Sequence, residues 1–252
     1  MTARLFINTT QLSFPQKIGD SVELSPDDTH YVRDVLRLRA GEPLELGDAN
    51  TGLVALTTIA CLTPLVAVSF HSILESRSPT PCSFTLLCAL LKGQKNDLVC
   101  DWATELGCSH IIFWQSSRSI VRIDNEKDRA HKELRLAKIA TAAAQQSKQS
   151  KPPVVRITRS LSDAFDSFLA SPTAQELRVV CSLASGSQPI RQMFSASPPT
   201  APCIVAIGPE GDFAPEEHDF LVARGFIPIS LGRRTLRSEL AVVTALSLLG
   251  NR

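Results

Sequence analysis

The chain has 252 residues, 44% of them hydrophobic and 20% charged, and its formal net charge is only +1. This length can form one large domain or two ordinary ones with buried cores, and the composition excludes disorder as the main state. No stretch reaches the roughly 18 consecutive apolar residues of a membrane helix, and the first residues lack the features of a secretory signal. We therefore expect a soluble, cytoplasmic protein without a membrane segment.

The cysteines and histidines favour neither a disulfide framework nor a metal site. The seven cysteines are odd in number, lie mostly in apolar contexts and include no C-x-x-C pair. The five histidines are scattered and contain no H-x-x-x-H pair. We interpret the cysteines as core thiols and expect no bound metal.

Residues 1–75 predict a small domain of short strands. The β-branched or apolar runs that we expect as strands are 42–48, 52–60 and 65–74. Before them, the apolar spacing in 25–41 predicts a helix with Ser25 or Asp28 as its N-cap and Gly41 at its end.

The only cluster of basic residues in this acidic domain lies on the expected helix. Residues 1–75 contain five Lys and Arg against nine Asp and Glu, and three of the five are Arg33, Arg37 and Arg39. Because Arg33 and Arg37 are four residues apart, they would share one helix face. The cluster is either a solvated helix face or a contact with RNA.

After a linker rich in Pro and Ser at 75–83, the pattern changes to alternating strands and helices. The expected strands are 84–91, 110–114, 153–158, 177–184, 202–208 and 226–232. The expected helices are 95–107, 126–147, 160–170, 214–225 and 238–250. This alternation predicts an α/β domain whose mainly parallel sheet is covered on both faces.

Two glycine-containing loops follow strands of this domain, and ligands of open α/β sheets bind beyond the carboxyl ends of strands. In "GPEG", Gly208 and Gly211 let the main chain approach a ligand closely, whereas the acid Glu210 would repel a phosphate. The Walker A motif and the dinucleotide fingerprint are both absent. The loop could also be a simple turn between a strand and a helix.

The second loop, "SLGRRTLRSEL" at 230–240, concentrates charge. Its arginines suit phosphates, base edges or an oxyanion, and Arg237 could instead form a structural ion pair with Glu239. A Ser-His-Asp hydrolase is disfavoured, because no G-x-S-x-G elbow is present.

Together the segments "IGPEGDFAPEE" and "LGRRTLRSEL" resemble the paired C-terminal motifs of SPOUT-class methyltransferases, specifically the 16S ribosomal RNA uridine-N3 methyltransferase family (RsmE). Three further segments are similar to motifs of that family in the same order: "HYVRDVLRLRAGEPLELGD", "LLKGQKNDLVCDWATELG" and "KIATAAAQQSKQSKPPVV". The resemblance covers nearly the whole chain.

The resemblance implies a PUA-like β-barrel domain for RNA binding in 1–75. It implies a SPOUT methyltransferase domain with a deep trefoil knot in 76–252. It further implies a homodimer that methylates N3 of a uridine in 16S rRNA of the small ribosomal subunit, with S-adenosyl-L-methionine (SAM) as cofactor.

The resemblance also implies roles for individual residues. The expected SAM-binding residues are Leu183, Ile207, Gly208, Glu210, Gly211, Leu231, Gly232 and Leu236. Arg237 would stabilise the uracil oxyanion, and Glu239 would act as general base or orient that arginine. The residues expected to grip the RNA backbone are Arg4, Arg33, Arg37, Arg118, Arg122, Lys148 and Lys151.

The chain departs from the family pattern at Leu240, where threonine is usual, and at Gln145 and Gln149 near the central loop. Roles of those family side chains are therefore not transferred. Two alternatives stay open: a SPOUT methyltransferase with another target, such as a ribose hydroxyl, and a non-catalytic RNA-binding or ribosome-assembly protein. The sequence does not define which uridine is modified, or whether free RNA or the assembled subunit is the substrate.

Overall fold

The computed structural model describes residues 2–8, 14, 17–74, 83–169, 176–193 and 201–250. By its internal contacts the chain divides into two compact units. The first combines Met1–Ser78 with Thr141–Pro152, and the second combines Pro79–Ala140 with Pro153–Arg252. The sequence-based division at residue 75 placed 141–152 in the second part, whereas its contacts place it in the first unit.

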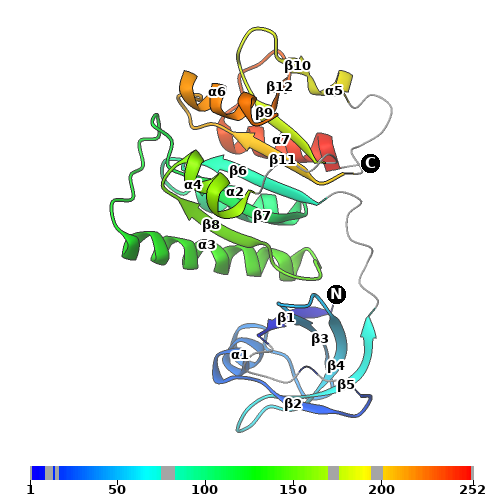
Figure 1. Cartoon of the computed structure of the whole chain (residues 1–252). Coiled ribbons are helices and arrows are strands. Elements are labelled where there is room, and N and C mark those ends of the chain that lie inside the picture. Colours follow the sequence, from blue (N-terminus) through cyan, green and yellow to red (C-terminus); the bar gives the residue numbers. More distant parts are fainter. Residues whose placement is uncertain are drawn as a thin grey trace. The chain divides into compact units, whose positions relative to one another are not determined.

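The first unit contains a curved five-stranded sheet (Figure 1) in the order β1-β3-β4-β5-β2. Its strands are β1 (Ala3–Ile7), β2 (Ser21–Glu23), β3 (Pro43–Asp48), β4 (Val54–Cys61) and β5 (Ala67–Leu74). β1 pairs with β3 in parallel, and the other pairs are antiparallel. Alternating side chains such as Leu44 and Leu46 are fully buried and form the core of the unit. The sequence predicted β3, β4 and β5 but not β1 or β2.

The helix of the first unit is shorter than the sequence predicted. The N-cap is confirmed, because the Asp28 amide donates to Ser25 Oγ at 3.1 Å. Helix α1 (Pro26–His30) then widens into a π-helical turn, η1 (Tyr31–Val35), in which hydrogen bonds reach back five residues instead of four. Arg37 follows with a φ of 55°. The prediction that Arg33 and Arg37 share a helix face is therefore wrong.

The second unit contains a seven-stranded sheet whose strand pairs are all parallel, in the order β10-β12-β9-β11-β6-β7-β8. The strands are β6 (Phe84–Ala89), β7 (Cys108–Trp114), β8 (Val154–Thr158), β9 (Leu177–Cys181), β10 (Gln188–Pro189), β11 (Cys203–Ile207) and β12 (Ile227–Ser230). The helices are α2 (Lys95–Glu105), α3 (Glu126–Gln146), α4 (Leu161–Phe168), α5 (Ile190–Met193), α6 (Pro215–Ala223) and α7 (Ser238–Gly250). The predicted α/β architecture is confirmed, and only the short β10 and α5 were not predicted.

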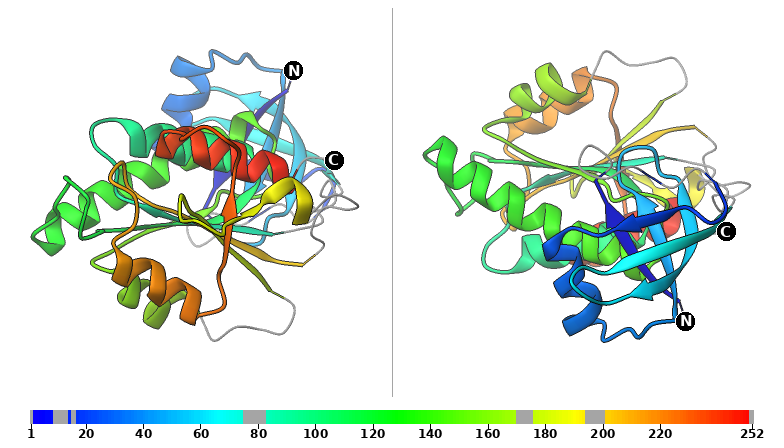
Figure 2. Two further views of the ribbon diagram at one scale, coloured as in Figure 1. Left: turned by 90° about the horizontal axis from the view of Figure 1, so that it is seen from above. Right: turned by 90° about the horizontal axis from the view of Figure 1, so that it is seen from below.

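Helices cover both faces of this sheet, as Figure 2 shows with α2 and α7 on one side and α4 and α6 on the other. Neighbouring side chains of β6 point to opposite faces. Leu86 belongs to the core with α2, α3 and α7, whereas Leu87 belongs to the core with α4 and α6. Both residues are fully buried, which explains why this strand is a continuous apolar run.

Most of the cysteines are core thiols, as predicted: Cys88, Cys100, Cys108 and Cys203 are buried. Cys61 is exposed at the end of β4, so the prediction is wrong for this residue. Cys82 lies outside the described residues. Among the helices of the described part of the chain, none is long and apolar enough to cross a membrane.

Candidate active site

A cavity of about 510 Å³ lies at the carboxyl ends of β9, β11 and β12, which are neighbours in the sheet. Three loops line it: 181–183 after β9, 207–212 after β11 and 229–238 around the end of β12. All eight residues expected to bind the cofactor line this cavity: Leu183, Ile207, Gly208, Glu210, Gly211, Leu231, Gly232 and Leu236. Its volume lies in the range of about 300–1,000 Å³ that is typical of small-molecule sites.

The first wall is formed by the turn that follows β11. A Cβ atom on Gly208 would lie 3.0 Å from the Phe213 ring and 3.2 Å from the Phe213 amide nitrogen, so a side chain there would displace its neighbour. The Asp212 amide donates to the carbonyl of Pro209 at 3.0 Å and closes the turn. Phe213 is itself held in place, because its ring stacks on the Trp114 ring with 5.9 Å between the ring centroids. The wall here consists largely of main chain.

The second wall is formed by the loop between β12 and α7. Gly232 has a φ of 142°, a conformation that residues with a side chain rarely adopt. Arg237 is exposed, lines the cavity and directly precedes α7, whose Ala241 amide donates to the Arg237 carbonyl at 2.8 Å. Among the described residues, the Arg237 guanidinium has no partner. It is therefore available to a ligand.

Two carboxylates meet one ammonium beside these walls. Lys95 Nζ lies 2.9 Å from Glu210 Oε1 and 3.5 Å from Glu239 Oε2, and the Lys92 amide donates to Glu210 Oε1 at 3.3 Å. Burial raises the pKa of Glu210, but its hydrogen bonds from Lys95 and the main chain outweigh burial, so this pKa is lowered. The hydrogen bond to Glu210 raises the pKa of Lys95. Lys95 and Glu210 are therefore a charged pair at neutral pH.

The structure separates the two expected catalytic residues. Glu239 is 9% exposed in the first turn of α7, its Oε2 accepts no hydrogen bond, and it is not among the residues that line the cavity. Among the described residues, Glu239 pairs with Lys95 and not with Arg237, so the alternative Arg237–Glu239 ion pair is not formed. Arg237 thus faces the cavity, whereas Glu239 lies behind it.

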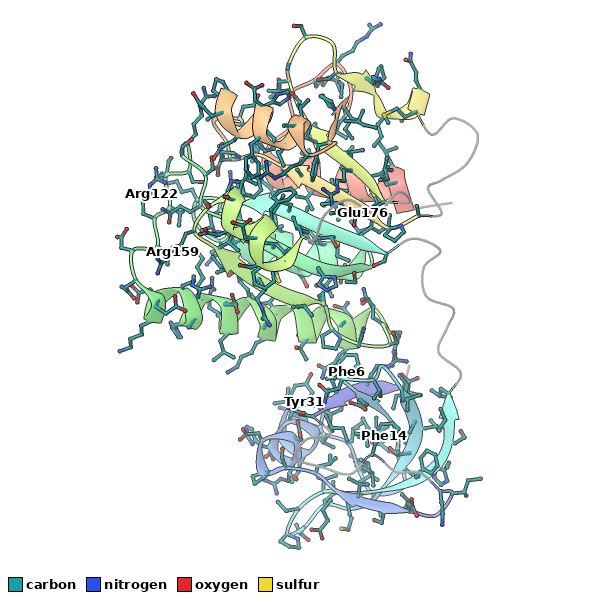
Figure 3. The ribbon with its side chains drawn as sticks, in the orientation of Figure 1. Phe6, Phe14, Tyr31, Arg122, Arg159 and Glu176 are labelled. Carbon is teal, nitrogen blue, oxygen red and sulfur yellow. The ribbon has the colours of Figure 1, made fainter. Side chains whose placement is uncertain are left out.

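The loop between β7 and α3 supports the first wall from outside. The Glu217 carboxylate accepts hydrogen bonds from Ser116 Oγ at 2.8 Å and from the amides of Ser117 and Ala214 at 3.0 Å each. Arg118 donates to the carbonyl of Gly211 at 3.1 Å. Arg122, labelled in Figure 3, donates to two carbonyls of its own loop at 2.9 Å. Arg118 and Arg122 thus bind the protein's own main chain.

The other residues expected to bind RNA lie in the first unit and differ in their surroundings. Arg4 lies 2.9 Å from the Glu45 carboxylate, and Lys148 lies 2.8 Å from it. Arg33 pairs with its neighbour Asp34 at 3.0 Å.

The two remaining residues of that group are Arg37 and Lys151. Both are exposed, and neither side chain has a partner among the described residues. Of the residues expected to bind RNA in this unit, Arg37 and Lys151 are therefore the ones whose charge is available to RNA.

Sequence reasoning missed Lys95, although it is part of a segment that resembles the family. It lies 115 residues before Glu210 and 144 before Glu239, so no local spacing could reveal the cluster. Among the described residues, no group of three His, Cys, Asp or Glu side chains is placed to hold a metal ion.

Comparison with known proteins shows to which family this chain belongs. Residues 78–250 match the model of the RNA methyltransferase domain family. Ribosomal RNA small subunit methyltransferase E of Synechocystis sp. is 30% identical over 234 residues, covering 92% of this chain and 73% of the relative. The protein of the same name from Bacillus subtilis is 27% identical and covers 97% of this chain and 94% of the relative.

A solved structure agrees with these sequence matches. A Legionella pneumophila methyltransferase, solved in complex with the bound cofactor SAM, matches with a TM-score of 0.83 at 28% identity, covering 99% of this chain and 97% of that one. The chain therefore belongs to the RNA methyltransferase domain family and, within it, to the ribosomal RNA small subunit methyltransferase E family.

Proposed function

We propose that this protein transfers a methyl group from SAM to N3 of a uridine in the ribosomal RNA of the small subunit. One observation is decisive for this proposal: in a chain of this family, all three loops expected to hold SAM enclose a single cavity. The non-catalytic alternative is disfavoured, because the cavity is open and Arg237 faces it without a partner among the described residues.

The residues of the cavity fit SAM. Main chain at Gly208 and Gly232 suits the edge of an adenine, and the side chains of Leu183, Ile207 and Leu236 suit its faces and the ribose. Leu183 is 63% exposed, so a ligand in the cavity would cover an apolar side chain. When bound, SAM supplies a methyl group made electrophilic by its sulfonium.

The chemistry of the target atom defines what the protein must do. N3 of uridine has an imide proton that must pass to water before N3 can attack, and the base must first be exposed. We assign to Arg237 the stabilisation of the negative charge that then develops on the uracil oxygen. Glu239 orients Arg237 indirectly, since it belongs to the first turn of the helix that Arg237 precedes.

The architecture proposed for the second unit includes the trefoil knot of the SPOUT class. α7 follows β12, which lies on one side of β9, yet α7 packs against β11 on the other side of β9 and against α2. The chain must therefore cross β9 near the loops of the cavity, as a knotted C-terminal segment would.

The first unit, in this proposal, is a PUA-like barrel that binds ribosomal RNA, and the protein acts in the cytoplasm as a homodimer. The curved five-stranded sheet supports the barrel. Leu240, which is 48% exposed on α7 between the lining residues Ser238 and Ala241, supports a second subunit there.

Methyl transfer from labelled SAM to small subunits that lack their own modification tests the proposal, with mass mapping of the modified nucleoside. We expect the methyl group on uridine N3. We expect Arg237→Ala to abolish transfer while its SAM affinity stays within a few-fold, and Arg233→Ala, whose side chain does not line the cavity, to retain transfer.

Two results would contradict this assignment. A methyl group on a ribose hydroxyl would exclude the uridine-N3 reaction while sparing the fold. Binding of SAM and subunits without any transfer would favour the non-catalytic alternative.

A further inference from the structure

Lys95 connects the two walls of the cavity through a third element. Its side chain projects from the first residue of α2, just after β6. Glu210 belongs to the turn after β11, and Glu239 belongs to the first turn of α7, directly after the loop of β12. With Nζ at 2.9 Å from the first carboxylate and 3.5 Å from the second, one ammonium holds segments that are far apart in the sequence.

The charges show what this ammonium prevents. Without it, Glu210 and Glu239 would both face the same position, and two carboxylates that share a site repel each other. Glu239 would be affected most, because its Oε2 is buried and accepts no hydrogen bond from any described residue. A buried carboxylate without a partner is costly, so loss of the ammonium disfavours the present position of the first turn of α7.

The base from which Lys95 projects is rigid. The Asn96 side chain accepts a hydrogen bond from the Leu91 amide at 2.9 Å and donates to the Leu91 carbonyl at 2.7 Å, which fixes the turn between β6 and α2. Lys95 therefore projects from a fixed turn toward its two partners.

Arg237 depends on this arrangement, since it lies two residues before Glu239 and its carbonyl accepts the first hydrogen bond of α7. We propose that Lys95 is a positioning residue, whose ammonium sets the turn 208–212 and the start of α7 in their mutual geometry and thereby places Arg237 at the cavity. The expected effect on the rate of methyl transfer rests on the proposed function. The coupling between the two walls of the cavity does not depend on that function.

The test compares the full-length wild type with Lys95→Met, which keeps the length of the stem, and Lys95→Arg, which keeps the charge. Amide hydrogen exchange in 208–212 and 236–241 is measured without ligand, followed by SAM affinity and single-turnover transfer. We expect Lys95→Met to speed exchange in both segments and to lower the transfer rate about tenfold or more, the effect of losing one charge-assisted hydrogen bond. Lys95→Arg restores most of the rate.

Arg135→Ala is the matched control, because it removes the ion pair between Arg135 and Asp97 of α2, and neither of these residues lines the cavity. It leaves exchange in both segments and the transfer rate as in the wild type. A double variant, Lys95→Met with Glu210→Gln, adds a second measurement: coupled residues give an effect on exchange that is smaller than the sum of the two single effects.

The inference is overturned if Lys95→Met lowers the melting temperature while both segments exchange as in the wild type. Additive effects in the double variant overturn it as well. If the wild type transfers no methyl group, the proposed function fails, but the exchange measurements still decide whether Lys95 joins the two walls.

Discussion

Gly208 and Gly211 differ in the space around them, although both line the cavity. A Cβ atom on Gly208 would approach Phe213 to 3.0 Å, whereas a Cβ on Gly211 would lie 3.7 Å from Arg118, an ordinary van der Waals contact. Gly208 is buried and Gly211 is exposed. The shape of the turn therefore requires glycine at Gly208 for steric reasons.

We expect Gly208→Ala to lower the free energy of unfolding by about 1–3 kcal/mol, the usual effect of an added methyl group in a packed site. Gly211→Ala should change the free energy of unfolding by no more than about 0.5 kcal/mol, as an exposed substitution without strain does. Urea unfolding of the two variants measures the difference. Equal changes in the free energy of unfolding for the two variants would show that the Phe213 ring can shift to accommodate the added methyl group without destabilising the protein.

The residues of the cavity illustrate what sequence can reveal about a site. The glycine-containing loops could be predicted from the residues, because they follow strands and ligands bind beyond strand ends. The apolar lining residues were expected only from the resemblance to the family. The surroundings of charged residues could not be predicted. Arg118 and Arg122 look like free cations in the sequence, but their partners are carbonyl groups, which every residue has.

At the scale of elements, Glu217 joins α6 to the loop after β7. Its carboxylate caps the Ala214 amide at the start of α6 and accepts two hydrogen bonds from Ser116 and Ser117. Because the turn 208–212 leads directly into α6, this single carboxylate holds the outer side of the first wall.

We expect Glu217→Ala to destabilise the protein by about 1–3 kcal/mol, since the hydrogen-bond donors that it leaves are partly buried. Exchange of the Ser117 and Ala214 amides should become faster. Glu216→Ala is the control, because Glu216 is exposed in the same helical turn. Chemical denaturation and hydrogen exchange check both variants, and equal losses would mean that only the charge near the helix terminus matters.

The elements themselves were largely predictable, and the exceptions have physical reasons. Long apolar runs such as β6 and β11 cannot remain exposed to water, so their burial is encoded locally. β10 has two residues and α5 has four, too short for any period to emerge. The π-helical turn after α1 arises from hydrogen bonds that a helical spacing pattern cannot distinguish from ordinary ones.

At the scale of the whole molecule, the basic residues expected to bind RNA fall into two groups. Some pair with other groups of the protein, and the others have no partner among the described residues. Arg4 and Lys148 share the Glu45 carboxylate within the first unit. Burial raises the pKa of Glu45, yet its hydrogen bonds to Lys148 and Arg4 lower it further than burial raises it. This cluster stabilises the unit, whereas Arg37 and Lys151 are exposed.

We therefore expect Arg37→Ala and Lys151→Ala each to reduce the slope of log affinity against log salt by about one for binding to ribosomal RNA. Arg4→Ala should leave this slope unchanged and lower the melting temperature, because it leaves Glu45 with one cation instead of two. Filter binding at a series of salt concentrations gives the slopes. A reduced slope for Arg4→Ala would mean that its ion pair opens to RNA.

The division into units was only partly readable from the sequence. The linker at 75–83 marks a change from short strands to alternating strands and helices. Thr141–Pro152 consists of the last residues of the long helix α3 and the loop after it, and nothing local indicates that it belongs to the first unit. Membership of such a segment depends on partners such as Glu45, which is 103 residues away from Lys148.

The order of the cavity loops along the chain has a consequence for synthesis on the ribosome. The lining residues lie between Cys181 and Ala241, whereas β6, an inner strand of the sheet, ends at Ala89. At about 5–20 residues per second, roughly 8 to 30 seconds separate the emergence of β6 from that of the last lining residue. A nascent chain can therefore begin its core long before it can hold a ligand, so the ligand cannot assist the early steps of folding.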